Sequence, residues 1–383
     1  MAEERKLTVD WRTVPGRYIK DPRLGHRLGR NYAGGEIAHW EWNNVWFGTD
    51  QDGFVHNGTT PRDYHADDKS LTRVFVMGGS TAMGMGVNSN SETLSAQLER
   101  FLRADSPKIR VLNCGVGSYM SWQQLSYLSL ELIGYQPDVI VVLDGINDCL
   151  SSTWGNKGLR GGWIPNTHRS LDDVVQMVLQ ASGYSSLSHQ LRRRILSSKL
   201  AAKIKTFFDE LQHTASTKVE MPNKIWGEMD YSTWSVKPES VDWYIRNVRS
   251  AIGLSRANGA KIIYLLQPQL AWGSRKRTDE ESALFAKIAA RMPPVPTLVP
   301  EWFAMVRSRF LELRKDLHDG CMVHVEDASE WLDDVDETVY HDWNHYNARG
   351  QEVLALRIQR ILRGMGIGVP KKDEHVHHSQ ARL

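Results

Sequence analysis

Ser80 and a distant Asp–His pair give this chain the side chains of nucleophilic catalysis. Ser80 lies in the sequence GGST at positions 78–81, directly after a β-branched run at 73–77. Asp342 and His345 stand three residues apart in the sequence DWNH. A serine hydroxyl is a weak nucleophile unless a base takes its proton, and the base needs a partner to hold its tautomer. At this spacing on a turn, the carboxylate can reach Nδ1 of His345 and leave Nε2 for Ser80.

Structural explanations for both segments stay open from the residues alone. A tight turn with an incidental serine accounts for 78–81, and a helix N-terminus capped by an aspartate or asparagine accounts for 342–345. His341 and His345, at positions i and i+4, also have a spacing that suits metal ligation, but no HExxH sequence accompanies them. We therefore expect no metal site here.

Two further loops carry hydrogen-bond donors suited to an oxyanion. The sequence NCGVGSY at 113–119 can present the backbone N–H groups of Gly117 and Ser118, and DGIND at 144–148 adds the side-chain amide of Asn147. Each such donor contributes on the order of 3 kcal/mol to the stability of the transition state in acyl transfer.

Nucleotide-binding and ordinary α/β-hydrolase motifs are excluded by spacing. Gly79 and Gly84 match the ends of a Walker A sequence, but Met85 stands where the lysine is needed, and no GxGxxG follows the strand. The GxSxG elbow also fails, because Ala82 takes the place of its last glycine.

The elements around these motifs predict an α/β fold. The β-branched runs are continuous, which is typical of strands covered on both faces, at 73–77, 110–113, 138–143, 260–266 and, more weakly, 321–325. Helical periodicity lies between them at 91–104, 121–132, 241–257, 300–317 and 348–362. This alternation indicates a three-layer α/β/α sandwich with a mostly parallel, flavodoxin-like sheet, whose carboxyl edge gathers the four motif segments.

The domain organisation follows from the parts that break this alternation. Residues 1–70 are expected to form an N-terminal cap segment of hairpins and loops packed on the main domain, 71–365, and residues 366–383 a flexible tail. A helical insertion is expected at 150–240, including an amphipathic helix at 188–211. The basic face of that helix is either solvated or a surface for a membrane or an acidic ligand.

Composition narrows the class of protein. Lys plus Arg total 47 against 45 for Asp plus Glu, and this net charge of +2 argues against nucleic-acid binding. Three cysteines without CxxC spacing argue against a disulfide framework or a zinc ribbon. Neither a signal peptide nor a transmembrane segment is recognised, so we expect a cytoplasmic protein without a membrane span and without a cofactor.

The four blocks, taken in order, resemble those of the SGNH (GDSL-like) hydrolases, a family that includes bacterial esterases and acetylesterases. GGST is similar to the nucleophile block, 113–119 to the glycine block, GIND to the GxND block and DWNH to the DxxH block. The resemblance covers about residues 70–150 and 255–362. The N-terminal sequence, with Leu24–Gly25 and then 44–56, is also similar to the lead-in of bacterial members, which implies a single integrated domain.

The resemblance implies a role for each matching residue. Ser80 is the nucleophile, His345 the general base and then acid, and Asp342 its orienter. Asn147 and the backbone N–H groups of Ser80 and of Gly117 or Ser118 form the oxyanion hole. The family often has glycine at the position of Ser118, and a backbone donor does not require one.

These observations predict a serine esterase that forms an acyl-enzyme. The expected substrate is a small-molecule or carbohydrate ester with a short acyl group such as acetyl, and Trp343 is a candidate wall of its pocket. An O-acyltransferase with the same triad, a lipase or thioesterase, and a catalytically silent sugar-binding module stay open as alternatives. The sequence does not indicate an oligomeric state.

Overall fold

A computed structural model of the chain describes residues 18–21, 23–32, 37–39, 42–45, 48–58, 62–153 and 234–369. These residues all belong to one compact unit, formed by 15–162 and 230–383. The expected helix at 188–211, most of the expected insertion, and residues 370–383 of the expected tail lie outside the described residues.

The central sheet has the strand order expected from the sequence. Its five strands pair in the order β6-β5-β7-β8-β9, and every pairing is parallel. The strands are β5 (Thr72–Gly78), β6 (Ile109–Asn113), β7 (Val139–Asp144), β8 (Lys261–Leu266) and β9 (Val323–Asp327). This is the flavodoxin-like order. Its first strand, β5, lies inside the sheet, with the second strand added on one side of it and the later strands added on the other.

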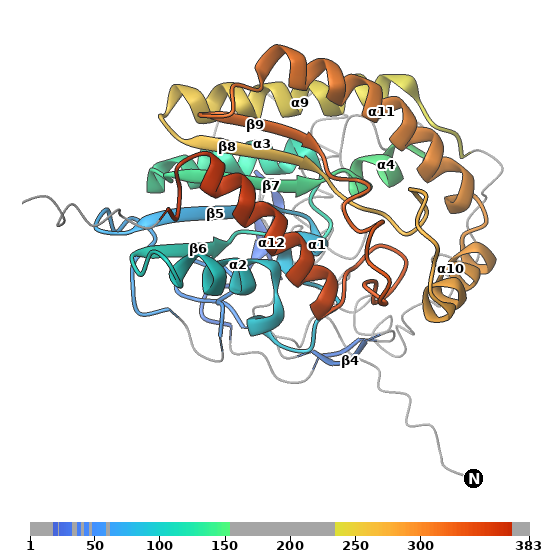
Figure 1. The fold of residues 1–383 in the computed structure, drawn as a ribbon, viewed down its shortest axis with the longest axis horizontal. Coiled ribbons are helices and arrows are strands. Elements are labelled where there is room, and N and C mark those ends of the chain that lie inside the picture. Colours follow the sequence, from blue (N-terminus) through green and yellow to red (C-terminus); the bar gives the residue numbers. More distant parts are fainter. Residues whose placement is uncertain are drawn as a thin grey trace, which may run out of the picture. The chain divides into compact units, whose positions relative to one another are not determined.

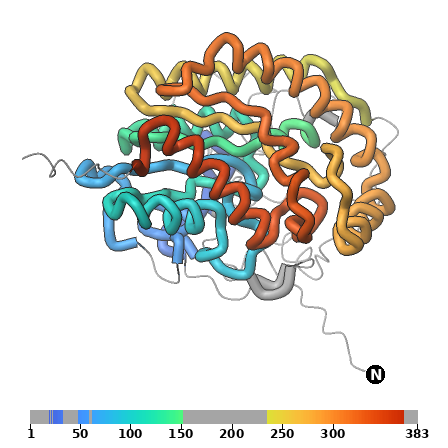
Figure 2. The backbone as a smooth tube through the Cα atoms, in the orientation of Figure 1, coloured from blue at the N-terminus to red at the C-terminus, as the bar shows by residue number. Residues whose placement is uncertain are grey.

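Helices cover both faces of the sheet, which confirms the α/β class (Figure 1). One face carries α2 (Leu94–Arg103) and α12 (Ala348–Gly364), and the other carries α3 (Ser121–Leu130), α9 (Pro238–Ala257) and α11 (Val295–Leu317). Figure 2 shows α2 and α12, which are far apart in the sequence, side by side. Buried glutamines join them, because Gln351 Oε1 accepts from the N–H of Leu94 (3.0 Å) and Gln359 Nε2 donates to the carbonyl of Phe101 (2.9 Å).

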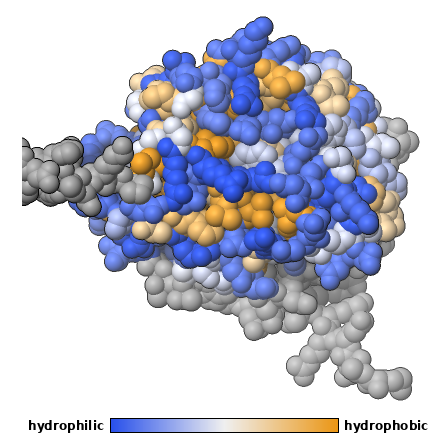
Figure 3. All heavy atoms as spheres, viewed as in Figure 1, coloured by the Kyte–Doolittle hydropathy of each residue, from blue (hydrophilic) through white to orange (hydrophobic). Residues whose placement is uncertain are grey.

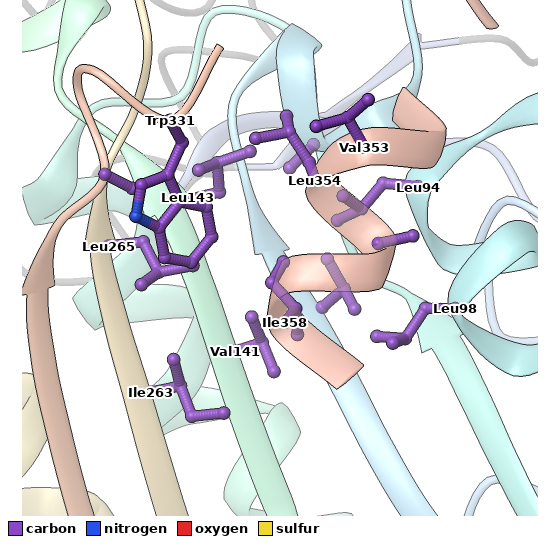
Figure 4. Close-up of a cluster of buried hydrophobic side chains, with 14 of the residues drawn as sticks. Leu94, Leu98, Val141, Leu143, Ile263, Leu265, Trp331, Val353, Leu354 and Ile358 are labelled. Atoms are coloured by element: carbon purple, nitrogen blue, oxygen red, sulfur yellow. The ribbon is translucent and has the colours of Figure 1, made fainter. Parts of the chain in front are cut away.

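The core beneath α2 and α12 explains why the strand sequences are continuously apolar. Alternate residues of β7 and β8 point toward these helices, and the residues between them point toward α9 and α11, so both faces exclude water. Figure 4 shows the first of these two layers, with the buried side chains Leu94, Leu98, Val141, Leu143, Ile263, Leu265, Trp331, Val353, Leu354 and Ile358.

The N-terminal segment contains two short antiparallel pairs. The first joins β1 (Tyr18–Asp21) to β2 (Gly25–Leu28), and the second joins β3 (Ile37–His39) to β4 (Trp42–Val45). Gln123 Nε2 of α3 donates to the carbonyl of Leu24 (2.8 Å), which ties the first hairpin to the main sheet unit. The division into a cap and a main domain stays a prediction.

Three helices differ from the sequence expectation. Helix α10 (Asp279–Arg291) was not expected, although Leu284 and Phe285, which pack against the core, and buried Ile288 repeat at helical spacing. Its capping box, Thr278 with Glu281, was a further available signal. Helices α1 (Ser80–Met83) and α4 (Ile146–Thr153) begin immediately after β5 and β7, where loops were expected. Single turns of 3₁₀ helix lie at Asn90–Glu92 and Leu132–Tyr135.

The described surface is mainly polar. Figure 3 shows a mostly hydrophilic face with apolar residues gathered in limited patches. Among the described residues the large exposed apolar side chains are Leu130, Trp243, Leu311 and Val369. No helix in this described part combines the length and the apolar character that crossing a bilayer requires.

Candidate active site

Ser80 stands at the carboxyl end of β5, as the first residue of the short helix α1. Its side chain is 8% exposed. The first hydrogen bond within α1 runs from the N–H of Met83 to the carbonyl of Gly79 (3.0 Å), so the N–H of Ser80 has no partner inside the helix. The strand-to-helix turn therefore presents the hydroxyl and the backbone N–H of the same residue at the edge of the sheet.

His345 and Asp342 complete a hydrogen-bonded chain with Ser80. His345 Nε2 lies 2.8 Å from Ser80 Oγ, and His345 Nδ1 lies 2.7 Å from Asp342 Oδ2. Because Asp342 accepts at Nδ1, the neutral imidazole carries its proton there and leaves Nε2 as an acceptor for the serine hydroxyl. The structure thus brings together three residues that span 265 positions of the sequence.

The loop around Asp342 holds the carboxylate in its ionised form. Its Oδ1 accepts from the N–H groups of Asn344 (2.9 Å) and His345 (2.8 Å). Burial by itself raises the pKa of Asp342, but the charge and hydrogen bond of His345 and the two backbone donors outweigh burial and bring the pKa to about 2. The bridge between Tyr340 and Tyr346 closes this loop just before α12.

Gly86 explains how the loop can lie so close to the turn after β5. Its φ is +105°, and a Cβ there would stand 2.5 Å from the carbonyl of Tyr346 and 3.3 Å from Cβ of His345. A side chain at this position would push the imidazole away from Ser80.

Asn147 lies beside the nucleophile turn. A Cβ on Gly79 would stand 2.5 Å from Asn147 Nδ2, so the amide occupies the space that the missing side chain leaves open. The same nitrogen donates to the carbonyl of Tyr119 (2.9 Å). An amide nitrogen has two N–H groups, so one remains for an atom bound at Ser80.

The segment that carries Gly117 and Ser118 is fixed on several sides. The N–H of Val116 donates to the carbonyl of Gly78 (3.1 Å), which sets the turn next to Ser80. Ser118 has φ +65°, the left-handed conformation that favours glycine. This agrees with the glycine that the resembled family often has there.

His26 is a residue near the site that the sequence did not indicate. Its Nε2 lies 2.9 Å from the carbonyl of Gly117, and Tyr119 Oη donates to the carbonyl of His26 (2.6 Å). No chemical motif surrounds His26, and the N-terminal lead-in that resembles the family does not include it, so no sequence signal indicated this contact.

The hydrogen bonds of two aspartates close to Asn147 in the sequence, buried Asp144 and half-buried Asp148, were also not indicated by the sequence. Asp144 accepts hydrogen bonds from Tyr244 Oη (2.6 Å) and Tyr264 Oη (2.8 Å). Asp148 accepts from the N–H (2.9 Å) and Oγ (2.6 Å) of Ser121. Burial raises the pKa of both carboxyl groups above the usual aspartate range, and the charge of Asp148 adds to the effect on Asp144.

The remaining candidate residues are placed without a demonstrated role. Trp343 is half-buried next to Asp342, and its place in a substrate pocket stays a prediction. Cys114 and Cys149 are buried and neither forms a disulfide, and burial raises the pKa of each, so both are protonated small apolar side chains.

The described residues were also compared with other kinds of site. Within the described ranges no group of three or more His, Cys, Asp or Glu side chains is arranged to hold a metal ion. A cavity of about 410 Å³ is lined by residues that include His56, Tyr64, Glu99 and Arg110, and by none of the Ser80–His345–Asp342 set.

Comparison with known proteins gives similarity at the level of fold. No protein-family model and no curated protein matches the chain. An acetylxylan esterase from Geobacillus stearothermophilus, solved as a catalytic mutant, is 14% identical, with 79% of this chain and 98% of that one covered and a TM-score of 0.40. A psychrotrophic esterase from Pseudoalteromonas sp. is 11% identical, with coverages of 76% and 97% and a TM-score of 0.38.

A GDSL-like lipase from Bacteroides thetaiotaomicron is also 11% identical, with coverages of 76% and 88% and a TM-score of 0.36. At such low identities and TM-scores, these likenesses say nothing about what this chain acts on.

Proposed function

We propose that this protein is a serine ester hydrolase of the SGNH type, with Ser80 as nucleophile, His345 as base and Asp342 as orienter. The observation that carries the proposal is the continuous chain from Ser80 Oγ through His345 to Asp342, with separations of 2.8 and 2.7 Å. Distances and acceptor roles of this kind are those of an activated serine.

The proposed reaction has two half-reactions. Ser80 Oγ attacks the ester carbonyl while its proton moves to His345 Nε2, and the tetrahedral intermediate then expels the alcohol, which takes that proton. A water molecule attacks the acyl-enzyme in the same way, and the carboxylic acid leaves. Asp342 remains ionised throughout and stabilises the imidazolium.

The proposed oxyanion hole consists of the Asn147 amide, the N–H of Ser80 and the N–H of Gly117 or Ser118. The contact of Asn147 Nδ2 with the Gly79 backbone and the unpaired position of the Ser80 N–H in α1 support this assignment. Donors fixed before the reaction stabilise developing charge without a cost of reorganisation.

The proposed substrate is a short-chain O-acyl ester, such as an acetyl ester, of a carbohydrate or a similar hydroxylated molecule. The exposed part of Trp343 beside Asp342 supports a sugar-sized alcohol, since an aromatic face packs well against a sugar ring. Transfer of the acyl group to a sugar hydroxyl instead of water uses the same residues and is the second candidate.

Intact-mass spectrometry with a fluorophosphonate tests the proposal, together with release of p-nitrophenol from acetate, butyrate and octanoate esters. We expect one label on the wild type, none on Ser80→Ala, and the fastest turnover on acetate. Ser255→Ala is the matched control, because this serine is buried and donates to a helix carbonyl away from the motifs. Label on Ser80→Ala would refute the nucleophile, and octanoate as the best ester would indicate a lipase.

A further inference from the structure

Asn147 and Asp148, adjacent at the start of α4, both reach the segment that leads into α3. Asn147 Nδ2 donates to the carbonyl of Tyr119 (2.9 Å), and Asp148 accepts from Ser121 at two atoms, N (2.9 Å) and Oγ (2.6 Å). Three hydrogen bonds therefore join the first turn of α4 to residues 119–121. This segment directly follows Gly117 and Ser118.

Asp148 supplies what the local sequence of α3 lacks. Ser121 is the first residue of α3, and Met120 stands at the N-cap position, where a Ser, Thr, Asp or Asn side chain usually accepts a free N–H. Asp148, from another helix, provides that acceptor, and its negative charge is favourable at a helix N-terminus. Gln123 Oε1 of α3 accepts from the N–H of Met120 (3.2 Å), and Asp148 of α4 accepts from the N–H of Ser121, so both helices fix the start of α3.

The direction of the hydrogen bonds makes Asp148 the acceptor. Asn247 Nδ2 of α9 donates to Ser121 Oγ (2.9 Å), so the hydroxyl proton of Ser121 points to Asp148 Oδ1. Neighbouring Asp144 is occupied by the hydroxyl groups of Tyr244 and Tyr264. Among residues 62–153 and 234–369, the hydrogen-bond partners of both carboxyl groups are neutral N–H and O–H donors, with no arginine, lysine or histidine.

Asp148 is half-buried, and its carboxylate has no cation among these partners to offset the partial loss of water. We propose that Asp148 is a positioning residue: by accepting both hydrogen bonds of Ser121 it holds segment 117–121 in register with Asn147, so that the donors on both converge on Ser80. This inference rests on the proposed esterase function and names no direct contact of Asp148 with substrate.

The test compares Asp148→Ala, Asp148→Asn and Ser121→Ala with Asp138→Asn as the control. Asp138 accepts the N–H of Arg73 (2.8 Å) at the amino end of β7, so its substitution removes a similar contact at the opposite edge of the sheet. The readouts are kcat and KM on p-nitrophenyl acetate, with kcat expressed per serine labelled by the fluorophosphonate. Counting labelled serines removes the effect of any unfolded fraction.

We expect Asp148→Ala to lower kcat on the order of 10- to 10²-fold with little change in KM, because misplaced donors weaken binding of the transition state only. Asp148→Asn and Ser121→Ala should each give part of this loss, since each keeps some of the hydrogen bonds. Because both residues act through one oxyanion hole, the Asp148→Ala loss should shrink in an Asn147→Ala background.

Several outcomes would overturn the inference. One is wild-type kcat per labelled serine in all three variants, and another is a loss in Asp138→Asn equal to that in Asp148→Ala. A third is a double variant in which the fold-losses in kcat of Asp148→Ala and Asn147→Ala multiply in full. Each would leave the esterase proposal intact. If Asp148→Ala does not fold, the other two variants decide. A wild type that neither labels nor turns over would instead refute the proposed function, and the inference with it.

Discussion

Asp342 and the pair Asp144 and Asp148 lie near the same carboxyl edge of the sheet, yet their surroundings act on them in opposite directions. Asp342 faces an imidazole and two backbone N–H groups, and its pKa falls to about 2. Asp144 and Asp148 face neutral donors and each other, and burial raises the pKa of both. Partners, more than burial itself, therefore decide the direction in which the pKa of a carboxyl group at this edge shifts.

The largest expected effect on kcat is at Asp342, the carboxyl group whose pKa is lowered. Asp342→Asn keeps the size of the side chain but no longer holds the Nδ1–H tautomer of His345, so kcat should fall on the order of 10³- to 10⁴-fold. The measurement is kcat on p-nitrophenyl acetate. Asp319→Asn is the matched control, because Asp319 also accepts backbone N–H groups in a tight loop, just before the amino end of β9. This substitution should leave kcat unchanged. Near wild-type kcat for Asp342→Asn would show that His345 needs no orienter.

A smaller effect on kcat is expected at Asn147, the neighbour of Asp148 and a member of the proposed oxyanion hole. Asn147→Ala removes the amide beside Gly79 and should lower kcat on the order of 10²- to 10³-fold, with KM changed much less. Asn258→Ala serves as control, because its amide donates to a backbone carbonyl (2.8 Å) at the end of α9. Gly79→Ala should resemble Asn147→Ala, since the new Cβ would displace the same amide. Equal losses in kcat and in the amount of folded protein would argue against an oxyanion donor.

The raised pKa values of Asp144 and Asp148 predict how the stability of the protein depends on pH. Over the pH range between the unfolded and folded pKa values of Asp144, the folded state holds a proton that the unfolded state has lost. The free energy of unfolding therefore falls as the pH rises through this range, by about 1.4 kcal/mol per pH unit for one such group. Asp144→Asn should reduce the difference between the free energies of unfolding at pH 5 and pH 8, as measured by urea denaturation.

The stability contributed by Asp342 depends on pH with the opposite sign to that of Asp144, because its pKa is lowered. Its lowered pKa contributes stability at neutral pH that is lost as the pH falls from about 4 toward 2. Asp342→Asn should thus lower the free energy of unfolding at neutral pH and remove this loss of stability between about pH 4 and pH 2. An unchanged pH dependence in Asp144→Asn would contradict the raised pKa of this pair.

The smallest expected effect concerns Ser118. Replacement by glycine relieves a left-handed backbone and also gives more freedom to the unfolded chain, so the two contributions partly cancel. The free energy of unfolding should change by about 1 kcal/mol or less, and kcat by less than ~2-fold. Gln136→Gly, with φ +55° and no place in the proposed site, is the control for the backbone contribution. A large loss of kcat in Ser118→Gly alone would show that the serine side chain takes part.

Much of the fold was accessible to sequence reasoning because the strands are buried on both faces. Continuous apolar runs such as 73–77 and 138–143 therefore marked β5 and β7 within one or two residues. Helix α10 was missed because its apolar stripe, Leu284, Phe285 and Ile288, is short and the side chains around it are mostly exposed. Helices α1 and α4 were missed because each is a short continuation of a strand end, where the residues also fit a turn.

The sequence by itself determined the order of the sheet and the residues that could form a nucleophile, a base and an oxyanion hole. It could do so because apolar periodicity and short motifs are local properties of the chain. Only the tertiary structure decided that Ser80 Oγ and His345 Nε2 lie 2.8 Å apart, that His26 contacts the Gly117 carbonyl, and that Asp148 caps a helix other than its own. These contacts join residues distant in sequence, and the charge of a buried carboxyl group depends on which of those residues the fold places around it.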